Sequence, residues 1–149
     1  RLTERFIHSD PVERAEAETL ITAIDRELAT LPSRGIDASS GVALVGIAAT
    51  FTTLAAMEKR LATYSHAEIH GSRITAPQVR AQVSSLQIKT IAQRKGIIGL
   101  APNRAEVIFA GACLIDRIMK FYGKDEMLVS DQGVRYGLLH EAAEAMQEG

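Results

Sequence analysis

The segment Val42-Ala43-Leu44-Val45-Gly46-Ile47-Ala48-Ala49-Thr50 carries the clearest indication of fold. Residues 42–45 are a continuous apolar run between two glycines, which is typical of a buried strand in a parallel sheet. Small residues follow, and apolar residues then recur at helical spacing between about residues 52 and 62. The segment therefore predicts a strand, a turn of small residues and a helix.

A second unit of the same kind lies near the other end of the chain. Met127-Leu128-Val129 is a short apolar run, Ser130-Asp131 follows it, and a helix is predicted from about Gly133 onwards. Both strands are short, apolar and followed by helices, so we expect them to be parallel neighbours joined by right-handed connections. The predicted fold class is α/β, rich in helix and with a small sheet.

Predicted helices occupy most of the remaining chain, because apolar residues recur there at helical spacing. Asp10, followed by Pro11, is the candidate N-cap of the first, and Asn103 is that of the longest, which Gly123 ends. A loop covers residues 32–41, and one more short strand fits between residues 64 and 75. The helices are predicted over residues 10–31, 76–91 and 103–122.

Composition excludes several classes of protein. The chain has 149 residues, of which 46% are hydrophobic and 23% charged, as expected for one globular domain. Seventeen basic and 18 acidic side chains give a net charge of −1, so no general basic excess favours nucleic acid or anionic lipid. No apolar run is long enough to span a bilayer. We therefore expect neither a nucleic-acid nor a membrane partner.

The single cysteine indicates a cellular compartment, and the first residues indicate whether the chain is part of a longer protein. Cys113 cannot form an internal disulfide and is expected to pack as a small core residue, which favours a reducing cytoplasm. The sequence opens at Arg1 in the middle of a pattern, and its first methionine is Met57. We therefore expect a piece of a longer protein, holding only part of an active site.

Charge is unevenly distributed along the chain. Six basic residues and no acidic residue occur between Ile69 and Ala105, so this stretch is called the basic window. One interpretation is a solvated helix surface, and the other is a local positive field for a polyanion. The window contains no aromatic residues for stacking on bases, which argues against single-stranded nucleic acid. Its members are Arg73, Arg80, Lys89, Arg94, Lys95 and Arg104.

Three further features are candidates for chemistry. The turn from Gly46 to Thr50 precedes a helix, where backbone N–H groups and the helix dipole favour an anion, although a purely structural turn has the same pattern. His66 and His70 lie four residues apart, but the glutamate between them is misplaced for a zinc-protease motif, and we predict no metal site. Asp131 follows a strand end, where ligand sites gather, and is equally suited to cap the last helix.

Five stretches, in this order, resemble motifs of the Ppx/GppA family of exopolyphosphatases and guanosine pentaphosphate phosphohydrolases. The resemblance extends over nearly the whole chain. The stretches are Arg1-Leu2-Thr3-Glu4-Arg5-Phe6, Val45-Gly46-Ile47-Ala48-Ala49-Thr50 continuing into Thr53-Leu54-Ala55-Ala56, His70-Gly71, Gly99-Leu100-Ala101-Pro102-Asn103-Arg104-Ala105-Glu106-Val107-Ile108 with Ala110-Gly111, and Val129-Ser130-Asp131-Gln132-Gly133-Val134-Arg135-Tyr136-Gly137-Leu138-Leu139.

The resemblance implies the ribonuclease H-like fold of actin, heat-shock chaperones and sugar kinases, in which two α/β domains face a cleft. Residues 1–149 would form most of the second domain, with a small mixed sheet. The family's catalytic glutamate and two phosphate loops would lie upstream, so we expect no catalytic residue in this chain, and the chain alone is expected to be inactive.

The reaction implied for the intact protein is hydrolysis of a terminal phosphoanhydride in polyphosphate or pppGpp. An upstream carboxylate would activate water and Mg²⁺, held outside this chain, would support the phosphates, since phosphoryl transfer is mainly positioning and charge neutralisation. The implied partners are polyphosphate or guanosine penta- and tetraphosphate. The expected phosphate-binding residues are Gly46, Ala49, Thr50 and Arg104, and the expected neighbours of the cleft are Arg94, Lys95, Asp131 and Arg135.

Four departures from the family pattern leave alternatives open. Ile47 replaces a threonine, Ala49 a glycine, Glu106 an aspartate and Tyr136 a glutamate. The first two motivate a module that senses polyphosphate or a guanosine nucleotide without turnover. A third interpretation is a docking surface for a homodimer partner on the apolar stripe of the helix predicted over residues 103–122.

Overall fold

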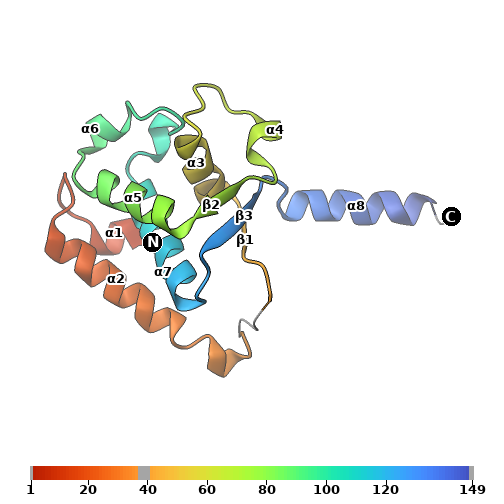
Figure 1. Ribbon diagram of the computed structural model, residues 1–149, viewed down its shortest axis with the longest axis horizontal. Coiled ribbons are helices and arrows are strands. Elements are labelled where there is room, and N and C mark those ends of the chain that lie inside the picture. The colour runs from red at the N-terminus through yellow and green to blue at the C-terminus, as the bar shows by residue number, and fades with distance from the viewer. Residues whose placement is uncertain (1, 37–40, 148–149) are drawn as a thin grey trace.

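The computed structural model describes residues 2–36 and 41–147, so part of the loop predicted over residues 32–41 lies outside the described residues. The elements form a helical body around a small sheet, and the last helix extends away from it (Figure 1). In chain order they are α1 (Leu2–Phe6), α2 (Arg14–Leu28), the 3₁₀ turn η1 (Pro32–Arg34), β1 (Val45–Ile47), α3 (Ala49–Glu58), α4 (His66–Ile69), β2 (Arg73–Thr75), α5 (Ala76–Gln87), α6 (Ile91–Arg94), the 3₁₀ turn η2 (Pro102–Arg104), α7 (Ile108–Phe121), β3 (Glu126–Ser130) and α8 (Val134–Gln147).

The sheet has the strand order β1-β3-β2. Strands β1 and β3 are parallel, with Gly46 opposite Val129, and β2 runs antiparallel to β3. The prediction of two parallel neighbours is confirmed, and the sheet is small and mixed as expected. Because β1 and β3 are parallel, their carboxyl ends meet at one edge of the sheet. That edge positions the candidate site.

The first strand differs from its prediction in position and burial. It begins at Val45 rather than Val42, although the carbonyl of Leu44 still accepts a hydrogen bond from the N–H of Leu128. Val45 and Ile47 are 48% and 43% exposed, whereas Gly46 between them is buried. The predicted buried strand is therefore wrong, because β1 is an end strand of the described sheet and its two outer residues alternate away from the buried side of Gly46.

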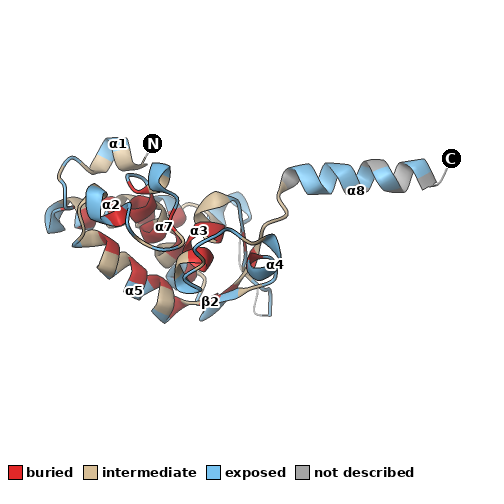
Figure 2. Cartoon of the chain, turned by 90° about the horizontal axis from the view of Figure 1, so that it is seen from above, coloured by how far each residue is buried: buried red, intermediate tan, exposed pale blue. Residues whose placement is uncertain are grey.

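The core surrounds α7. This helix packs against α2, α3 and α5, and the buried residues of Figure 2 concentrate in these four helices. Ile108, Ile115 and Met119 of α7 are each at most 2% exposed, so these members of the apolar stripe predicted as a docking surface pack within the chain instead. Cys113 is 1% exposed, as predicted for a core residue, and burial raises the pKa of its thiol to about 12.

Two helices begin later than their sequences predict. Helix α2 starts at Arg14 rather than Asp10, because the Asp10 carboxylate instead accepts a hydrogen bond of 2.8 Å from the N–H of Ile91, at the start of α6. Helix α7 starts at Ile108, because Asn103 lies within η2. The start of α5 at Ala76 is confirmed.

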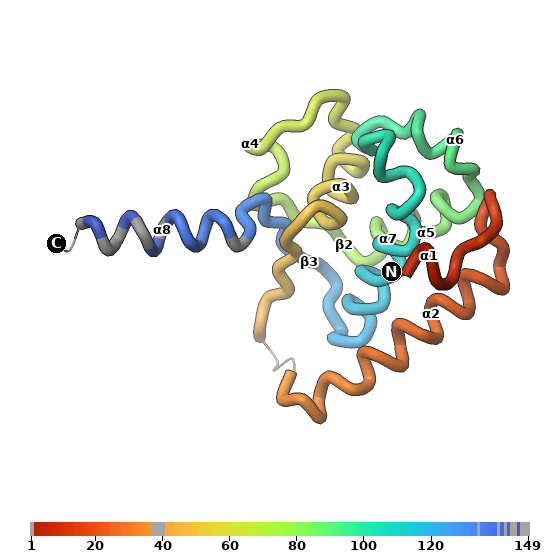
Figure 3. Tube along the Cα trace, turned by 180° about the vertical axis from the view of Figure 1, so that it is seen from behind, coloured from red at the N-terminus to blue at the C-terminus, as the bar shows by residue number. Residues whose placement is uncertain are grey.

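Helix α8 follows β3 as predicted and projects from the body in the views of Figure 1 and Figure 3. Several of its apolar side chains are exposed, including Leu138 at 60% and Leu139 at 67%. The described part of the chain contains no helix long and apolar enough to cross a bilayer.

Candidate functional site

The carboxyl end of β1 leads directly into α3. A single residue, Ala48, makes the turn, with φ 74° and ψ 176°, a conformation that is costly for any residue other than glycine. The first N–H groups of a helix lack intrahelical acceptors and carry the positive end of its dipole. The start of α3 therefore presents donors at the sheet edge where β3 also ends, as the sequence predicted.

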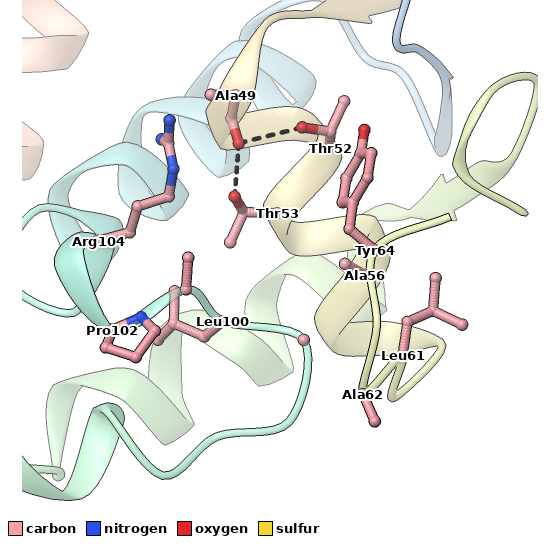
Figure 4. A pocket seen from close by; sticks show the side chains of 12 residues that line it. Ala49, Thr52, Thr53, Ala56, Leu61, Ala62, Tyr64, Leu100, Pro102 and Arg104 are labelled. Carbon is pink, nitrogen blue, oxygen red and sulfur yellow. Dashed lines mark hydrogen bonds between the residues drawn. The ribbon is translucent and has the colours of Figure 1, made fainter. Parts of the chain in front are cut away.

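A cavity of about 420 Å³ lies beside this helix start. Figure 4 shows Arg104 on one side of the first turns of α3 and Tyr64 on the other. The hydroxyls of Thr52 and Thr53 point between them and donate to the carbonyl of Ala49, at 3.3 and 2.6 Å. The cavity thus combines a cation and the start of a helix, which are both groups that bind phosphate, while the two hydroxyls are engaged with the carbonyl of Ala49.

A second cavity, of about 730 Å³, adjoins the first. Its lining includes Asp131, Arg135 and Tyr136, and it shares Ala49 and Thr52 with the first cavity. The two cavities therefore meet at the first turn of α3. Together they are called the cleft-edge site.

A stack of rings stands beside the second cavity. The His66 ring lies 5.5 Å from that of His70 and 6.2 Å from that of Tyr136, with interplanar angles of 8° and 15°. His66 Nδ1 lies 2.7 Å from Asp131 Oδ2, and His70 Nδ1 lies 3.5 Å from Ser130 Oγ. The stack joins α4, the end of β3 and the start of α8.

Asp131 is held ionised by its neighbours. Burial acts to raise the pKa of its carboxyl, but hydrogen bonds from Tyr64 and His66 outweigh burial and lower this pKa below its usual 3.8. For Tyr64, burial and then the contact with Asp131 raise the phenol pKa to about 12. At neutral pH the pair is therefore a neutral phenol bound to a carboxylate.

Four of the eight residues expected to bind phosphate or adjoin the cleft line the cleft-edge site. Ala49 lines both cavities, Arg104 the first, and Asp131 and Arg135 the second. Residues from η2, the end of β3 and α8 thus meet at the start of α3.

Gly46 and Thr50 support the site from behind and line neither cavity. Gly46 is buried within β1. Thr50 packs against Gly111 of α7, where an added Cβ would come within 2.7 Å of Thr50 Cγ2. The Thr50 side chain and Gly46 therefore set the position of the turn, and the N–H of Thr50 is one of the first donors of α3.

Arg94 and Lys95 occupy places that the sequence did not indicate. Arg94 is 1% exposed and lies in the core, where its guanidinium donates to the carbonyls of Leu86 and Ala105. Lys95 is exposed and belongs to neither cavity. The expected position beside the cleft is thus not found, because α6 turns Arg94 inwards.

The basic window does not form one anion path. Arg73 pairs with Glu126 across β2 and β3, Arg94 is buried, and Lys89 bonds to Ser85 beside a separate cavity near the C-terminal end of α3. Arg104 is the member that lines the cleft-edge site. None of the other five cations lines either cavity, so the interpretation of the window as a local field for a polyanion at this site is not supported.

Two residues that line the first cavity, Tyr64 and Thr52, were not indicated by the sequence as site residues. Tyr64 is a lone aromatic residue in a loop, and no spacing rule connects it with Asp131, 67 positions later. The two histidines also differ from a helical pair, since α4 ends at Ile69. In residues 2–36 and 41–147, no group of three or more His, Cys, Asp or Glu side chains is placed to hold a metal ion.

Known proteins similar to this chain share one family. The family model described as "Ppx/GppA phosphatase family" matches residues 1–146. Exopolyphosphatase 2 of Mycobacterium tuberculosis is 31% identical over 142 residues, which are 93% of this chain and 44% of that protein. A bifunctional 3-dehydroquinate synthase/phosphatase of Fusobacterium nucleatum is 29% identical over 144 residues, or 97% of this chain and 21% of that protein.

The fold also matches. The crystal structure of the Aquifex aeolicus member of the Ppx/GppA family superposes with a TM-score of 0.86 and 28% identity, over 99% of this chain and 46% of that one. An exopolyphosphatase from Cytophaga hutchinsonii has the same fold, with a TM-score of 0.80. This chain therefore spans less than half the length of these relatives, and the expected fold and family resemblance are confirmed. The chain belongs to the Ppx/GppA phosphatase family.

Proposed function

We propose that this chain supplies a phosphate-binding half of a phosphohydrolase that removes terminal phosphate from inorganic polyphosphate. The observation that carries the proposal is the convergence of Arg104 and the start of α3 on one cavity. The name of the Mycobacterium relative, an exopolyphosphatase, supports the choice of substrate.

The groups of the cleft-edge site would contact phosphate in different ways. Arg104 can make a bidentate contact to a phosphate, and the first N–H groups of α3 can bind the same or the next phosphate of a chain. Arg135 adds a positive charge at the adjoining cavity. All of these groups neutralise and position phosphate, which is the larger part of catalysis in phosphoryl transfer.

The chain's own carboxylates do not complete the reaction. Asp131 is the one carboxylate among the residues lining the two cavities, and it accepts hydrogen bonds from His66 and Tyr64. An ionised carboxylate whose pKa is lowered in this way is a poor general base. A single carboxylate that already accepts two hydrogen bonds is not a set of Mg²⁺ ligands, and the described residues hold no group of three or more His, Cys, Asp or Glu placed for a metal. We propose that the catalytic base and any Mg²⁺ ligands come from outside this chain.

A guanosine polyphosphate such as pppGpp is the second candidate substrate. One wall of the first cavity is apolar, formed by Ala56, Leu61, Leu100 and Pro102, and the Tyr64 ring lies beside it. An apolar wall next to phosphate-binding groups suits a nucleoside more than a bare phosphate chain.

Of the two substitutions that suggested a sensing module without turnover, Ala49 does not support that hypothesis. Alanine at position 49 does not constrain the loop, because the positive φ belongs to Ala48 and Ala49 already lies in α3. Ile47, 43% exposed at the end of β1, still lacks the hydroxyl of the family pattern. The hypothesis of a sensing module is therefore supported by the Ile47 substitution alone.

The test is replacement of Arg104 in the natural full-length protein. Losing a charged hydrogen bond to phosphate typically costs about 1.5–3 kcal/mol, so R104A should weaken substrate use roughly ten- to a hundredfold. Phosphate release is measured at low salt with polyphosphate and with pppGpp, and the substrate more affected identifies the ligand. The matched control is K95A, because Lys95 is an exposed cation that lines neither cavity.

Two outcomes would contradict the proposal. Unchanged kinetics in R104A would remove Arg104 from the site. Tight binding of either compound by the unaltered protein, without phosphate release, would favour the sensing module.

A further inference from the structure

Arg94 is a buried charge whose cost calls for an explanation. Its side chain is 1% exposed, and its guanidinium carbon lies 5.7 Å from the centre of the Phe109 ring. Its Nη2 has no hydrogen-bond partner among the described residues, and no carboxylate there forms an ion pair with it. Apolar replacements of buried charges are often neutral or stabilising, so stability alone is a weak reason for an arginine here.

The two hydrogen bonds that Arg94 makes close a loop of the chain. Nε donates to the carbonyl of Leu86, in the last turn of α5, at 2.9 Å, and Nη1 donates to the carbonyl of Ala105 at 3.3 Å. The second bond joins the first and last residues of the segment 94–105. Such a segment, with its ends held together, is a compact Ω-type loop.

Segment 94–105 is also a wall of the first cavity. Gly99, Leu100, Ala101, Pro102 and Arg104 all line that cavity. The segment packs directly on α3, since a Cβ at Gly99 would lie 2.4 Å from the carbonyl oxygen of Ala56. The carbonyl that Arg94 holds belongs to the residue immediately after Arg104, so it fixes the backbone from which Arg104 reaches the site.

We propose that Arg94 is a positioning residue for the cleft-edge site, which holds segment 94–105 so that Arg104 is presented to phosphate. The proposal rests on the proposed function, because it needs Arg104 to contact substrate. Arg94, the fully buried member of the basic window, would thus influence the cleft-edge site through the backbone, although it lines neither cavity.

The test is a double-mutant cycle in the natural full-length protein. R94M removes the guanidinium and keeps an unbranched apolar side chain, and R94K keeps a charge but cannot reach two carbonyls in fixed directions. We expect R94M to fold with a melting temperature close to that of the unaltered protein. Both variants should raise KM for polyphosphate about three- to tenfold with kcat changed less than about twofold, since misplacement of a binding group weakens binding.

The cycle separates positioning from general damage. If Arg94 acts through Arg104, R94M should change KM less than about twofold when combined with R104A, because the group that it positions is already absent. R117K is the matched control: Arg117 bonds twice to Asp25, at 2.6 and 2.8 Å, and lines neither cavity. It should leave KM unchanged.

The outcomes distinguish the two proposals. No effect of R104A alone overturns the proposed function. An effect of R104A with an unchanged KM in folded R94M, or with fully additive effects in the double variant, overturns the role of Arg94. Failure of both R94M and R94K to fold would assign Arg94 to stability and overturn the role as well.

Discussion

Replacing Gly111 by alanine tests how tightly the start of α3 is located. A Cβ at this position in α7 would lie 2.7 Å from Thr50 Cγ2 and 3.3 Å from Thr50 Oγ1. Carbon atoms in contact normally lie about 3.5–4.0 Å apart, so about 1 Å must be gained, either by rotation of the Thr50 side chain or by displacement of the first turn of α3, and we expect the displacement. Thr50 is adjacent to Ala49, which lines both cavities.

The expected effects on stability and on function differ in size. Alanine favours a helix interior over glycine by up to about 1 kcal/mol, whereas overpacking costs about 1–3 kcal/mol, so the net loss should be about 0–2 kcal/mol. A displacement of about 1 Å at a binding group can reduce activity about a hundredfold. G111A should therefore remain folded and lose most of its phosphate release.

The matched second change is Thr50→Ser, which removes the clashing methyl group and keeps the hydroxyl. The double variant G111A/T50S should recover most of the stability and most of the activity. Urea unfolding and phosphate release of the natural full-length protein measure the two effects. Normal activity in folded G111A, or no recovery in the double variant, would refute the reasoning that α7 locates the site through this contact.

Three further predictions concern titration, thiol reactivity and helix stability. Asp131→Asn should lower the melting temperature at pH 7, because hydrogen bonds from Tyr64 and His66 outweigh burial and lower the pKa of the Asp131 carboxyl in the folded protein. This stabilisation is lost when the carboxylate is protonated, so the difference in melting temperature from the unaltered protein should shrink as the pH falls below 3.8. The Cys113 thiol should react with an aromatic disulfide reagent only after unfolding, since burial raises its pKa to about 12; rapid reaction of the folded protein would contradict this burial. Gly137→Ala should stabilise α8 by roughly 0.5–1 kcal/mol, since nothing lies within 4 Å of the added Cβ; circular dichroism on heating measures it, and an unchanged or lowered melting temperature would count against the described helix.

Local pattern was sufficient for the elements that frame the site. The apolar runs at residues 42–45 and 127–129 predicted parallel neighbours, and the structure pairs Gly46 with Val129 in that way. The order of strand, small-residue turn and helix is also confirmed, although α3 begins at Ala49, three residues before the predicted start, because Ala48 alone makes the turn. Each strand and the turn depend on residues adjacent in the chain, and the parallel pairing followed from the rule for right-handed connections between such strands.

Only the tertiary structure decided which side chains meet at the site. Asp10 resembles an N-cap in sequence, but its carboxylate bonds to Ile91, 81 positions away. Arg94 and Arg104 belong to one basic window, yet the first is buried and the second lines a cavity. Side chains close in sequence separate because short helices rotate them to different sides, and distant ones such as Tyr64 and Asp131 meet because the sheet brings their loops to one edge. Hydrophobic periodicity specifies which face of an element is buried, but not which polar groups then become neighbours.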